Sequence, residues 1–180
     1  MEHFRINDKL RLELVKVEMA PVIFEAIDRD REYLKQWLPF VNFTFEVSDT
    51  EKFLQSLNSG NNKRDAVYSM WYKEEFAGLI GFKDTDWVNR KTEIGYWLAE
   101  KMQNKGIIIS CVKKLVEYAF KRLRFNRIQI KVAEENKKSE AIPLKLNFTF
   151  EGIERAGELH GNKLLNLKIY SLLATDTIIT

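Results

Sequence analysis

The segment Gln103–Ser110, written QNKGIIIS, has the residue types that bind an anion at the start of a helix. It combines Gly106 with Lys105 and leads directly into the amphipathic sequence CVKKLVEYAFKRL. The first turn of a helix has backbone N–H groups without helical partners and about half a positive charge. A glycine lets the backbone approach a phosphate closely, so the amides from Asn104 to Ser110 could form a phosphate cradle. Taken alone, these residues are a weak signal and favour an ordinary surface turn.

Other phosphate-binding and catalytic motifs are missing from the sequence. It has neither the GxxxxGK[ST] pattern of a P-loop nor the GxGxxG pattern of a Rossmann fold. Cys111 lies in the first turn of the expected helix, where a thiolate could be stabilised. Its candidate bases, His3 and His160, are both far away in the sequence, so we expect Cys111 to be a small packed residue. The two histidines also lack ligand spacing, and we expect no metal site.

The composition is that of a folded protein with a mild charge. The chain has 29 basic and 26 acidic residues and a net charge of +3. This charge is too small for an obligate nucleic-acid binder, although it would help an anionic ligand to approach. The basic segment 121–127, KRLRFNR, could contact RNA, but the end of a helix explains the same residues through the helix dipole. We therefore expect nucleic acid not to be the main partner.

Size, cysteine content and hydropathy favour one domain in a reducing compartment. Residues 1–180 fit a single domain that is large enough for a real core. The single cysteine cannot form an internal disulfide. The sequence MEHFRINDKLRLEL lacks the apolar stretch of a signal peptide, and no run approaches the roughly 18 apolar residues of a membrane span. We expect a cytoplasmic protein that does not enter the membrane, either a monomer or a small oligomer.

Hydrophobic periodicity predicts a mixed α/β domain whose first half is mostly antiparallel. The pattern predicts one strand over 10–15 and then a helix from Met19 to about Trp37. A capping-box pattern that starts at Ser48 predicts a second helix over 50–57, followed by a loop over 59–65. The clearest helix follows Gln103–Ser110, because its apolar residues recur at helical spacing. We further expect a short helix over 139–146 and strands over 66–72, 76–82, 92–98, 127–132, 148–153 and 163–173.

Several segments, in this order, resemble the GNAT superfamily of acetyl-CoA-dependent N-acetyltransferases. The most specific are IGYWLAEKMQNKGI, NKKSEAIPLKLNF and EGIERAGELHGNK, and the resemblance covers nearly the whole chain. The chain is most similar to the RimJ/RimL-type branch, which acetylates N-terminal amines of ribosomal proteins and, in relatives, other amines. The resemblance implies a central, mostly antiparallel sheet with splayed strands and flanking helices. It also implies acetyl-CoA as co-substrate and an amine acceptor that the sequence does not identify, and homodimers are common in this branch.

On this resemblance, Gln103–Ser110 corresponds to the Q/R-x-x-G-x-G/A loop that binds the pyrophosphate of CoA. Ile108 stands where the superfamily has Gly or Ala, so its side chain must point away from the phosphates. The strand Ile94–Leu98 would splay from the strand over 127–132, and its free backbone would pair with the pantetheine arm. The implied CoA-binding residues are Trp97, Leu98, Gln103, Asn104, Lys105, Gly106, Ile107, Ile108, Ile109, Ser110, Asn136 and Ser139.

The resemblance also implies two catalytic residues. Ser139, with Asn136 in the family's N-x-x-S pattern, would be the general acid for the departing sulfur, although it could instead only cap its helix. Glu158 would be the general base, directly or through a water, although it could instead be a solvated loop residue. Glu154 and Glu93 are weaker candidates. A site that partly desolvates the base would raise its pKa and make it more effective.

Five positions depart from the pattern of the superfamily or its branch. Pro143 stands where many members have a catalytic Tyr, so the tyrosine mechanism is not available in its usual form. Asn147 replaces the Gly of an L-G-F motif, and we expect the turn to survive because Asn tolerates positive φ. Asn166–Leu167 replaces an Asp-His pair in the closing strand. This pair and Ile108 leave an alternative open, a catalytically weak module of the same fold that binds acyl-CoA or docks on a protein.

Overall fold

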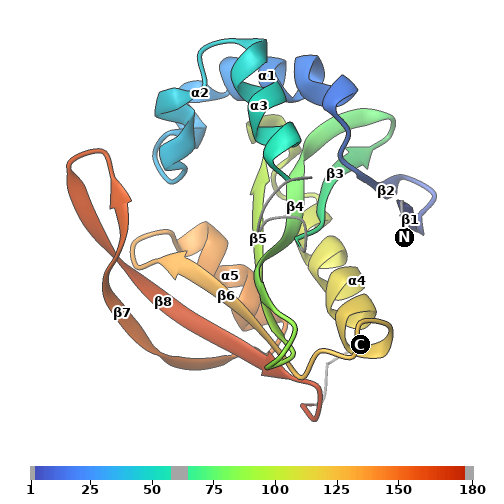
Figure 1. The fold of residues 1–180 in the computed structure, drawn as a ribbon, viewed down its shortest axis with the longest axis vertical. Helices are drawn as coiled ribbons and strands as arrows, with labels where there is room; N and C mark the ends of the chain where they lie inside the picture. The colour runs from blue at the N-terminus through green and yellow to red at the C-terminus, as the bar shows by residue number, and fades with distance from the viewer. Residues whose placement is uncertain (1–2, 58–64, 177–180) are drawn as a thin grey trace.

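The computed structural model describes residues 3–57 and 65–176, and these form one eight-stranded sheet (Figure 1). The strand order is β1-β2-β3-β4-β5-β6-β8-β7, and every neighbouring pair is antiparallel except β5 and β6. This is the mixed, mostly antiparallel α/β fold that the sequence predicts. The strands are β1 His3–Asn7, β2 Leu10–Leu14, β3 Val67–Tyr72, β4 Glu75–Asp86, β5 Lys91–Leu98, β6 Arg127–Ala133, β7 Thr149–His160 and β8 Lys163–Leu173.

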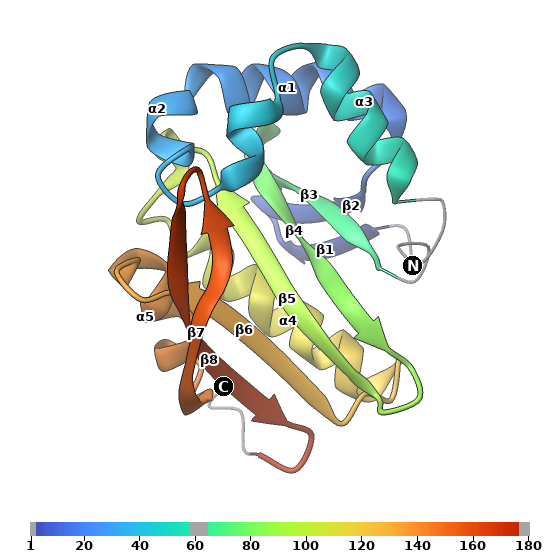
Figure 2. The ribbon, with the colours of Figure 1, turned by 60° about the vertical axis from the view of Figure 1, so that its left-hand side comes forward.

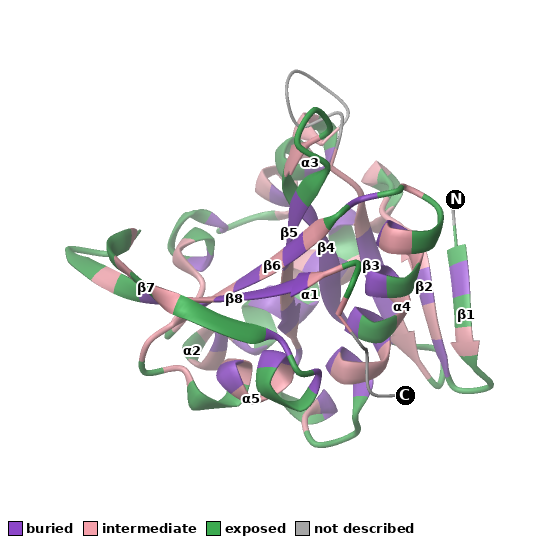
Figure 3. Ribbon diagram, turned by 90° about the horizontal axis from the view of Figure 1, so that it is seen from below, coloured by how far each residue is buried: buried purple, intermediate pink, exposed green. Residues whose placement is uncertain are grey.

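Helices cover both faces of the sheet (Figures 1 and 2). One core lies between the sheet and α4, and it includes Leu115 of α4 and Ile94 of β5. The second core lies on the other face, where Ile23 and Leu54 pack with Trp97 of β5. Figure 3 shows that buried residues concentrate along β4, β5 and β6, whereas β7 is largely exposed. The helices are α1 Ala20–Arg29, α2 Arg31–Leu34, α3 Val47–Ser56, α4 Ile107–Lys121 and α5 Lys137–Lys145, with 3-10 helices η1 Val17–Met19, η2 Pro39–Phe43 and η4 Glu100–Met102.

Strand β5 changes its pairing part-way along its length. Its first residues, Lys91–Glu93, pair in parallel with Arg127–Gln129 of β6, as expected for two strands that a helix connects. From Ile94 to Leu98, β5 is paired with β4 alone among the described strands. The predicted splay is therefore present, and it leaves one edge of β5 without a strand partner.

Strand β1 was missed, because the sequence prediction has one strand at 10–15 and none before it. Its five residues lie at the edge of the sheet, where only one side is paired. Phe4 is the one fully buried residue among them, and it packs edge-on against Tyr68 and Tyr118. One buried aromatic residue in a short, charged segment is too weak a period-2 signal to identify a strand.

Two helix predictions were wrong in detail. The helix expected from Met19 to Trp37 is interrupted at Asp30, whose carboxylate accepts a hydrogen bond of 2.8 Å from the backbone N–H of Glu100. This contact with a residue 70 positions away is invisible to local periodicity. Helix α3 begins at Val47, and its capping box uses Glu46 and Asp49 rather than Ser48. The loop expected over 59–65 lies outside the described residues, apart from its last position.

Candidate active site

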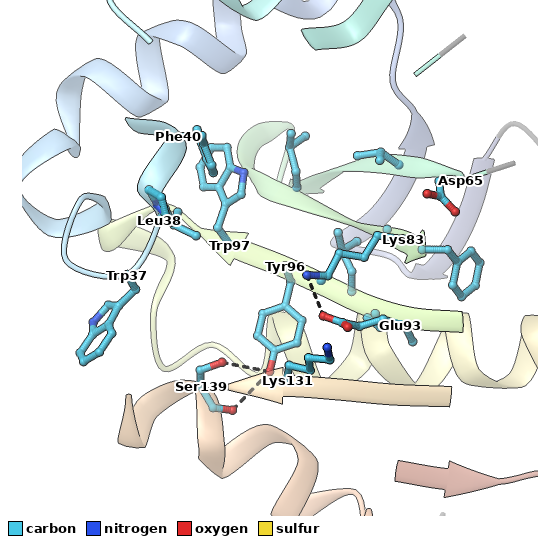
Figure 4. Close-up of a pocket in the computed structure, with 18 of the residues that line it drawn as sticks. Trp37, Leu38, Phe40, Asp65, Lys83, Glu93, Tyr96, Trp97, Lys131 and Ser139 are labelled. Carbon is cyan, nitrogen blue, oxygen red and sulfur yellow. Dashed lines mark hydrogen bonds and ion pairs between the residues drawn. The ribbon is translucent and has the colours of Figure 1, made fainter. Parts of the chain in front are cut away.

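The opening between β5 and β6 borders a cavity of about 570 Å³ (Figure 4). Its walls come from α1, η2, α3, β4, β5, β6, α5 and the β7–β8 hairpin. The apolar part of the wall includes Trp37, Phe40 and Trp97, and the polar part includes Ser139 and Glu158. A concave, mostly apolar space with a few convergent polar groups is the usual form of a small-molecule site.

The first turn of α4 has the shape of the predicted phosphate cradle. Gly106 is the N-cap residue with φ +70°, and a Cβ built there would meet nothing within 4 Å. The backbone there is therefore approachable from outside. Ile107 and Ile108 point into the core below the sheet, so the side chain of Ile108 leaves the cradle clear. Ser110 is less available than predicted, because its N–H already donates to the carbonyl of Gly106.

Polar side chains surround this turn. The ammonium of Lys138, on α5, donates a hydrogen bond of 2.9 Å to the side-chain oxygen of Gln103. Lys105 donates to the backbone carbonyl of Lys101, and Lys101 pairs with Glu75 at 2.6 Å. Asn104 has φ +60°, which helps the chain to turn before the helix. Lys105 and Lys138 thus add positive charge beside the turn that leads into α4, an arrangement that favours an anionic ligand.

Ser139 lies near the start of α5, beside the unpaired half of β5. The cap of α5 is Asn136, whose side-chain oxygen accepts a hydrogen bond of 3.1 Å from the Ser139 N–H. The alternative in which Ser139 only caps its helix was therefore wrong. Its hydroxyl donates to the phenolic oxygen of Tyr96 at 3.3 Å, and the same phenol donates to the Ser139 carbonyl at 3.2 Å (Figure 4).

Glu158 lines the cavity from β7, just after a bulge in that strand. The register shifts between Glu154 and Glu158, so residues 155–157 are looped out of the ladder, and Ala156 takes φ +53°. Burial is the main cause of a raised pKa at Glu158, with a smaller contribution from the nearby charge of Glu93. Lys83 and His160 oppose the shift. A half-buried carboxylate with this environment holds a proton more readily than a solvated one.

The two weaker base candidates are both held in ion pairs. Glu93 lines the cavity but is only 2% exposed, and its carboxylate pairs with Lys83 at 2.7 Å and accepts from Gln129 at 3.2 Å. Glu154 pairs with Lys131 at 2.8 Å and does not line the cavity. A carboxylate whose oxygens are already engaged by a cation has fewer lone pairs free to accept a proton from a bound amine.

The comparison with known families decides the class of protein. Residues 9–149 match the family model described as the acetyltransferase (GNAT) domain. The chain belongs to the GNAT acetyltransferase family. Its relative YdaF of Bacillus subtilis (strain 168) is 31% identical over 177 residues, which cover 96% of this chain and 95% of the relative. A ribosomal-protein-serine acetyltransferase of Escherichia coli (strain K12) is 26% identical over 94% of this chain and 96% of its own length.

Solved structures agree with this GNAT assignment. The microcin C7 self-immunity acetyltransferase MccE, solved with acetyl-CoA and AMP, superposes with a TM-score of 0.89 and is 27% identical over 96% of both chains. By homology this GNAT chain is an acetyl-CoA-dependent N-acetyltransferase, and its relatives agree with the RimJ/RimL-type branch that the sequence predicts. The open turn at Gly106 and the unpaired edge of Ile94–Leu98 fit the diphosphate and the amide-rich pantetheine arm of CoA.

Sequence reasoning missed Tyr96, which lines the cavity, and Glu140, which is next to Ser139 in sequence but does not line the cavity. Tyr96 lines the cavity and contacts Ser139, and its signal was its place in the half of the strand that was expected to splay. Glu140, next to Ser139, is 8% exposed and accepts hydrogen bonds from Lys168 and Tyr170 of β8. A glutamate in the first turn of a helix looks like a solvated residue in sequence, so its burial could not be predicted.

Other sequence hypotheses can also be checked against the structure. Cys111 is fully buried and burial raises its pKa to about 12, so it is a packed residue as predicted. Among the described residues, no group of three or more His, Cys, Asp or Glu side chains could hold a metal ion. No described helix is long and apolar enough to cross a membrane. Arg127, from the segment proposed as an RNA contact, is held by Glu151 at 2.5 and 2.6 Å.

Proposed function

We propose that this chain transfers an acetyl group from acetyl-CoA directly to a primary amine, with Glu158 as the general base and Ser139 as the general acid. One observation carries the proposal: a carboxyl with a raised pKa and a hydroxyl at the start of a helix line one cavity where the sheet opens. Acetyl-CoA supplies an activated acetyl thioester. The amine must lose a proton and the leaving thiolate must gain one, and these are the tasks assigned to Glu158 and Ser139.

The turn at Gly106 is the proposed anchor for the diphosphate of CoA. Backbone N–H groups at the start of α4 would bind its oxygens, and Lys105 and Lys138 would add positive charge nearby. The edge of β5 from Ile94 to Leu98, which includes Trp97, would pair with pantetheine through its backbone. Asn136 would support Ser139 through the hydrogen bond to its N–H.

The cavity also favours an acceptor that carries a positive charge before it reacts. Its acidic lining residues outnumber its basic ones, which are Lys83 and Lys131. The acidic residues are Asp49, Asp65, Asp84, Glu93 and Glu158. A protonated amine would be attracted to such a site and could then be deprotonated there. Both a protein N-terminus, as for the relative named as a ribosomal-protein-serine acetyltransferase, and a small amine have this group.

Two observations favour the enzyme over a catalytically weak binding module. Ile108 is buried in the core, so it does not obstruct the turn at Gly106. Asn166 replaces a family residue but has a local role, because its side-chain oxygen accepts a hydrogen bond of 3.0 Å from the N–H of Ala156 in the bulge before Glu158. We further propose that the enzyme works in the cytoplasm and that residues 1–180 form one domain. Assembly into a homodimer is compatible with this proposal.

The direct test measures thiol release from acetyl-CoA. The acceptors are peptides with a free N-terminus, the same peptides with that amine blocked, and polyamines. We expect turnover with at least one free amine, and a large loss of kcat in both Glu158→Gln and Ser139→Ala. Tight CoA binding with no turnover for any amine would instead establish the binding module.

A second test addresses the CoA turn alone, with two matched glycines. Gly106 and Gly161 both have positive φ, +70° and +58°, and open space around a built Cβ. Asn tolerates this conformation, so Gly106→Asn and Gly161→Asn should both fold. Gly106→Asn should raise the Kd for CoA, measured by calorimetry, while Gly161→Asn at the hairpin turn should leave it unchanged. Equal affinities in both variants would show that CoA does not bind at this turn.

A further inference from the structure

Helix α5 contains a proline that removes one of its internal hydrogen bonds. Pro143 lies inside the helix, and a proline has no backbone N–H. In an α-helix that N–H would donate to the carbonyl four residues earlier, which here belongs to Ser139. The carbonyl of Ser139 therefore lacks its usual helical donor, and the backbone of the proposed general acid depends on another partner.

Tyr96 provides this donor from a different element. It lies in the unpaired half of β5, and its side chain extends toward the start of α5 (Figure 4). Its hydroxyl donates to the Ser139 carbonyl at 3.2 Å. A phenol has a single proton, so its oxygen is then the acceptor for the Ser139 hydroxyl at 3.3 Å. Both contacts therefore form at once without competing for a proton.

Ser139 is thus fixed at three points. Asn136 accepts from its N–H, and Tyr96 binds both its carbonyl and its hydroxyl. The serine oxygen is held in place, while its hydrogen can still rotate about the C–O bond. A thiolate is a stronger acceptor than a neutral phenol because it is charged, so the hydrogen would turn to a developing thiolate without movement of the heavy atoms.

We propose that Tyr96 is a positioning residue that holds Ser139 for proton donation, in place of the hydrogen bond that Pro143 removes. The inference rests on the proposed role of Ser139 as the general acid. Tyr96 is not itself the proton source in this geometry, because its single proton is donated to the Ser139 carbonyl. Pro143 and Tyr96 are linked. Pro143 occupies the position of α5 where many family members have a tyrosine, and it also leaves the Ser139 carbonyl free to accept a hydrogen bond from Tyr96 of β5.

The experiment is a double-mutant cycle with Tyr96→Phe, Ser139→Ala and the double variant, read as kcat and KM for acetyl-CoA. Tyr96→Phe keeps the ring and removes only the hydroxyl, so we expect kcat to fall by about 2- to 10-fold, the size of one net hydrogen bond, with little change in KM. In the Ser139→Ala background the same change should alter kcat by less than about 2-fold, because its target hydroxyl is gone. Calorimetric CoA affinity and melting temperature serve as folding controls.

The outcomes separate this inference from the proposed function. If Ser139→Ala leaves kcat unchanged, the role of Ser139 fails and the inference fails with it. If Ser139→Ala reduces kcat but Tyr96→Phe has no effect, or its effect multiplies fully with that of Ser139→Ala, only the inference is overturned. Should Tyr96→Phe lower the melting temperature, the cycle is repeated with Pro143→Ala, which returns an N–H to the helix and makes the carbonyl independent of Tyr96.

Discussion

Helix α5 and the bulged part of β7 border the same cavity, and each has a glutamate whose pKa is shifted, but in opposite directions. Glu140 of α5 accepts hydrogen bonds from Lys168 at 2.5 Å, Tyr170 at 2.6 Å and Lys137 at 3.0 Å. These donors lower its pKa from 4.5 to about 2. The carboxylate of Glu158, on β7, has no hydrogen bond or ion pair with any described residue within the usual distances, and burial raises its pKa.

The comparison shows that the groups around a carboxylate determine whether it has a structural or a catalytic role. Three donors make Glu140 a poor base, and two of them, Lys168 and Tyr170, tie α5 to β8 next to Ser139. Glu158 is desolvated without being neutralised, so its lone pairs remain available to a ligand. Replacement by glutamine should therefore have a different consequence at each site. Glu140→Gln should reduce stability, and Glu158→Gln should reduce turnover.

The largest expected effect is the loss of turnover in Glu158→Gln. Removal of a general base reduces kcat by about 100-fold or more. Glutamine has the same shape and no base, so the free energy of unfolding should change by less than about 0.5 kcal/mol at this half-buried, unpaired site. Steady-state thiol release and urea denaturation measure the two quantities.

Glu154→Gln is the matched control for this change. Glu154 lies on the same strand, but it pairs with Lys131 and does not line the cavity. We expect its kcat to stay within about 2-fold of the unmodified protein, since the loss of a surface ion pair has little effect. A larger loss in Glu154→Gln than in Glu158→Gln would reverse the assignment of the base.

The second effect is on stability and concerns Glu140→Gln. The glutamine keeps the size of the side chain but loses charge-assisted hydrogen bonds to Lys168 and Lys137, which should cost about 1.5–3 kcal/mol. Glu135→Gln, at an exposed position just before α5, should cost less than about 0.5 kcal/mol. Denaturant unfolding of both variants gives the comparison, and equal stabilities would contradict the structural role of Glu140.

The same two glutamates predict two separate pH dependences, one of stability at low pH and one of kcat/KM at higher pH. Because the folded protein lowers the pKa of Glu140, its contribution is fully present above pH 4.5 and is lost as the pH falls toward about 2. The stability difference between the unmodified protein and Glu140→Gln should therefore shrink across this range. For Glu158 the raised pKa means that kcat/KM should rise with pH through a value above 4.5, and this limb should be absent in Glu158→Gln.

Sequence reasoning was most successful where local pattern and family resemblance determine the structure. The amphipathic stripe of α4, the turn at Gly106 and the positive φ of Asn147 needed no knowledge of distant contacts. The break at Asp30 and the network of Glu140 were missed because both depend on residues far away in the chain. The link between Pro143 and Tyr96 could be predicted only in part. The sequence shows that Pro143 lacks an N–H, but only the structure shows that the Tyr96 hydroxyl donates to the Ser139 carbonyl in its place.

The smallest expected effect concerns the bulge that positions Glu158. Ala156 adopts φ +53°, a conformation that costs a non-glycine residue about 1–2 kcal/mol. Asn166 offsets this cost, because its side chain accepts from the Ala156 N–H at 3.0 Å and donates to Glu134 at 3.2 Å. Asn166→Ala should therefore loosen the bulge and reduce kcat by about 2- to 10-fold without changing the Kd for CoA.

Two control variants accompany this prediction. One lies outside the bulge, and the other relieves the backbone strain within it. Asn162→Ala, at the exposed hairpin turn, should leave kcat unchanged, since no hydrogen bond from its side chain to a described residue is involved in the bulge. Ala156→Gly removes the cost of positive φ, so it should restore part of the kcat lost in Asn166→Ala. If Ala156→Gly gives no recovery, Asn166 acts on the reaction by a route other than the bulge. Recovery would show that Asn166, which departs from the family pattern, supports the proposed base Glu158 of β7 from the neighbouring strand β8.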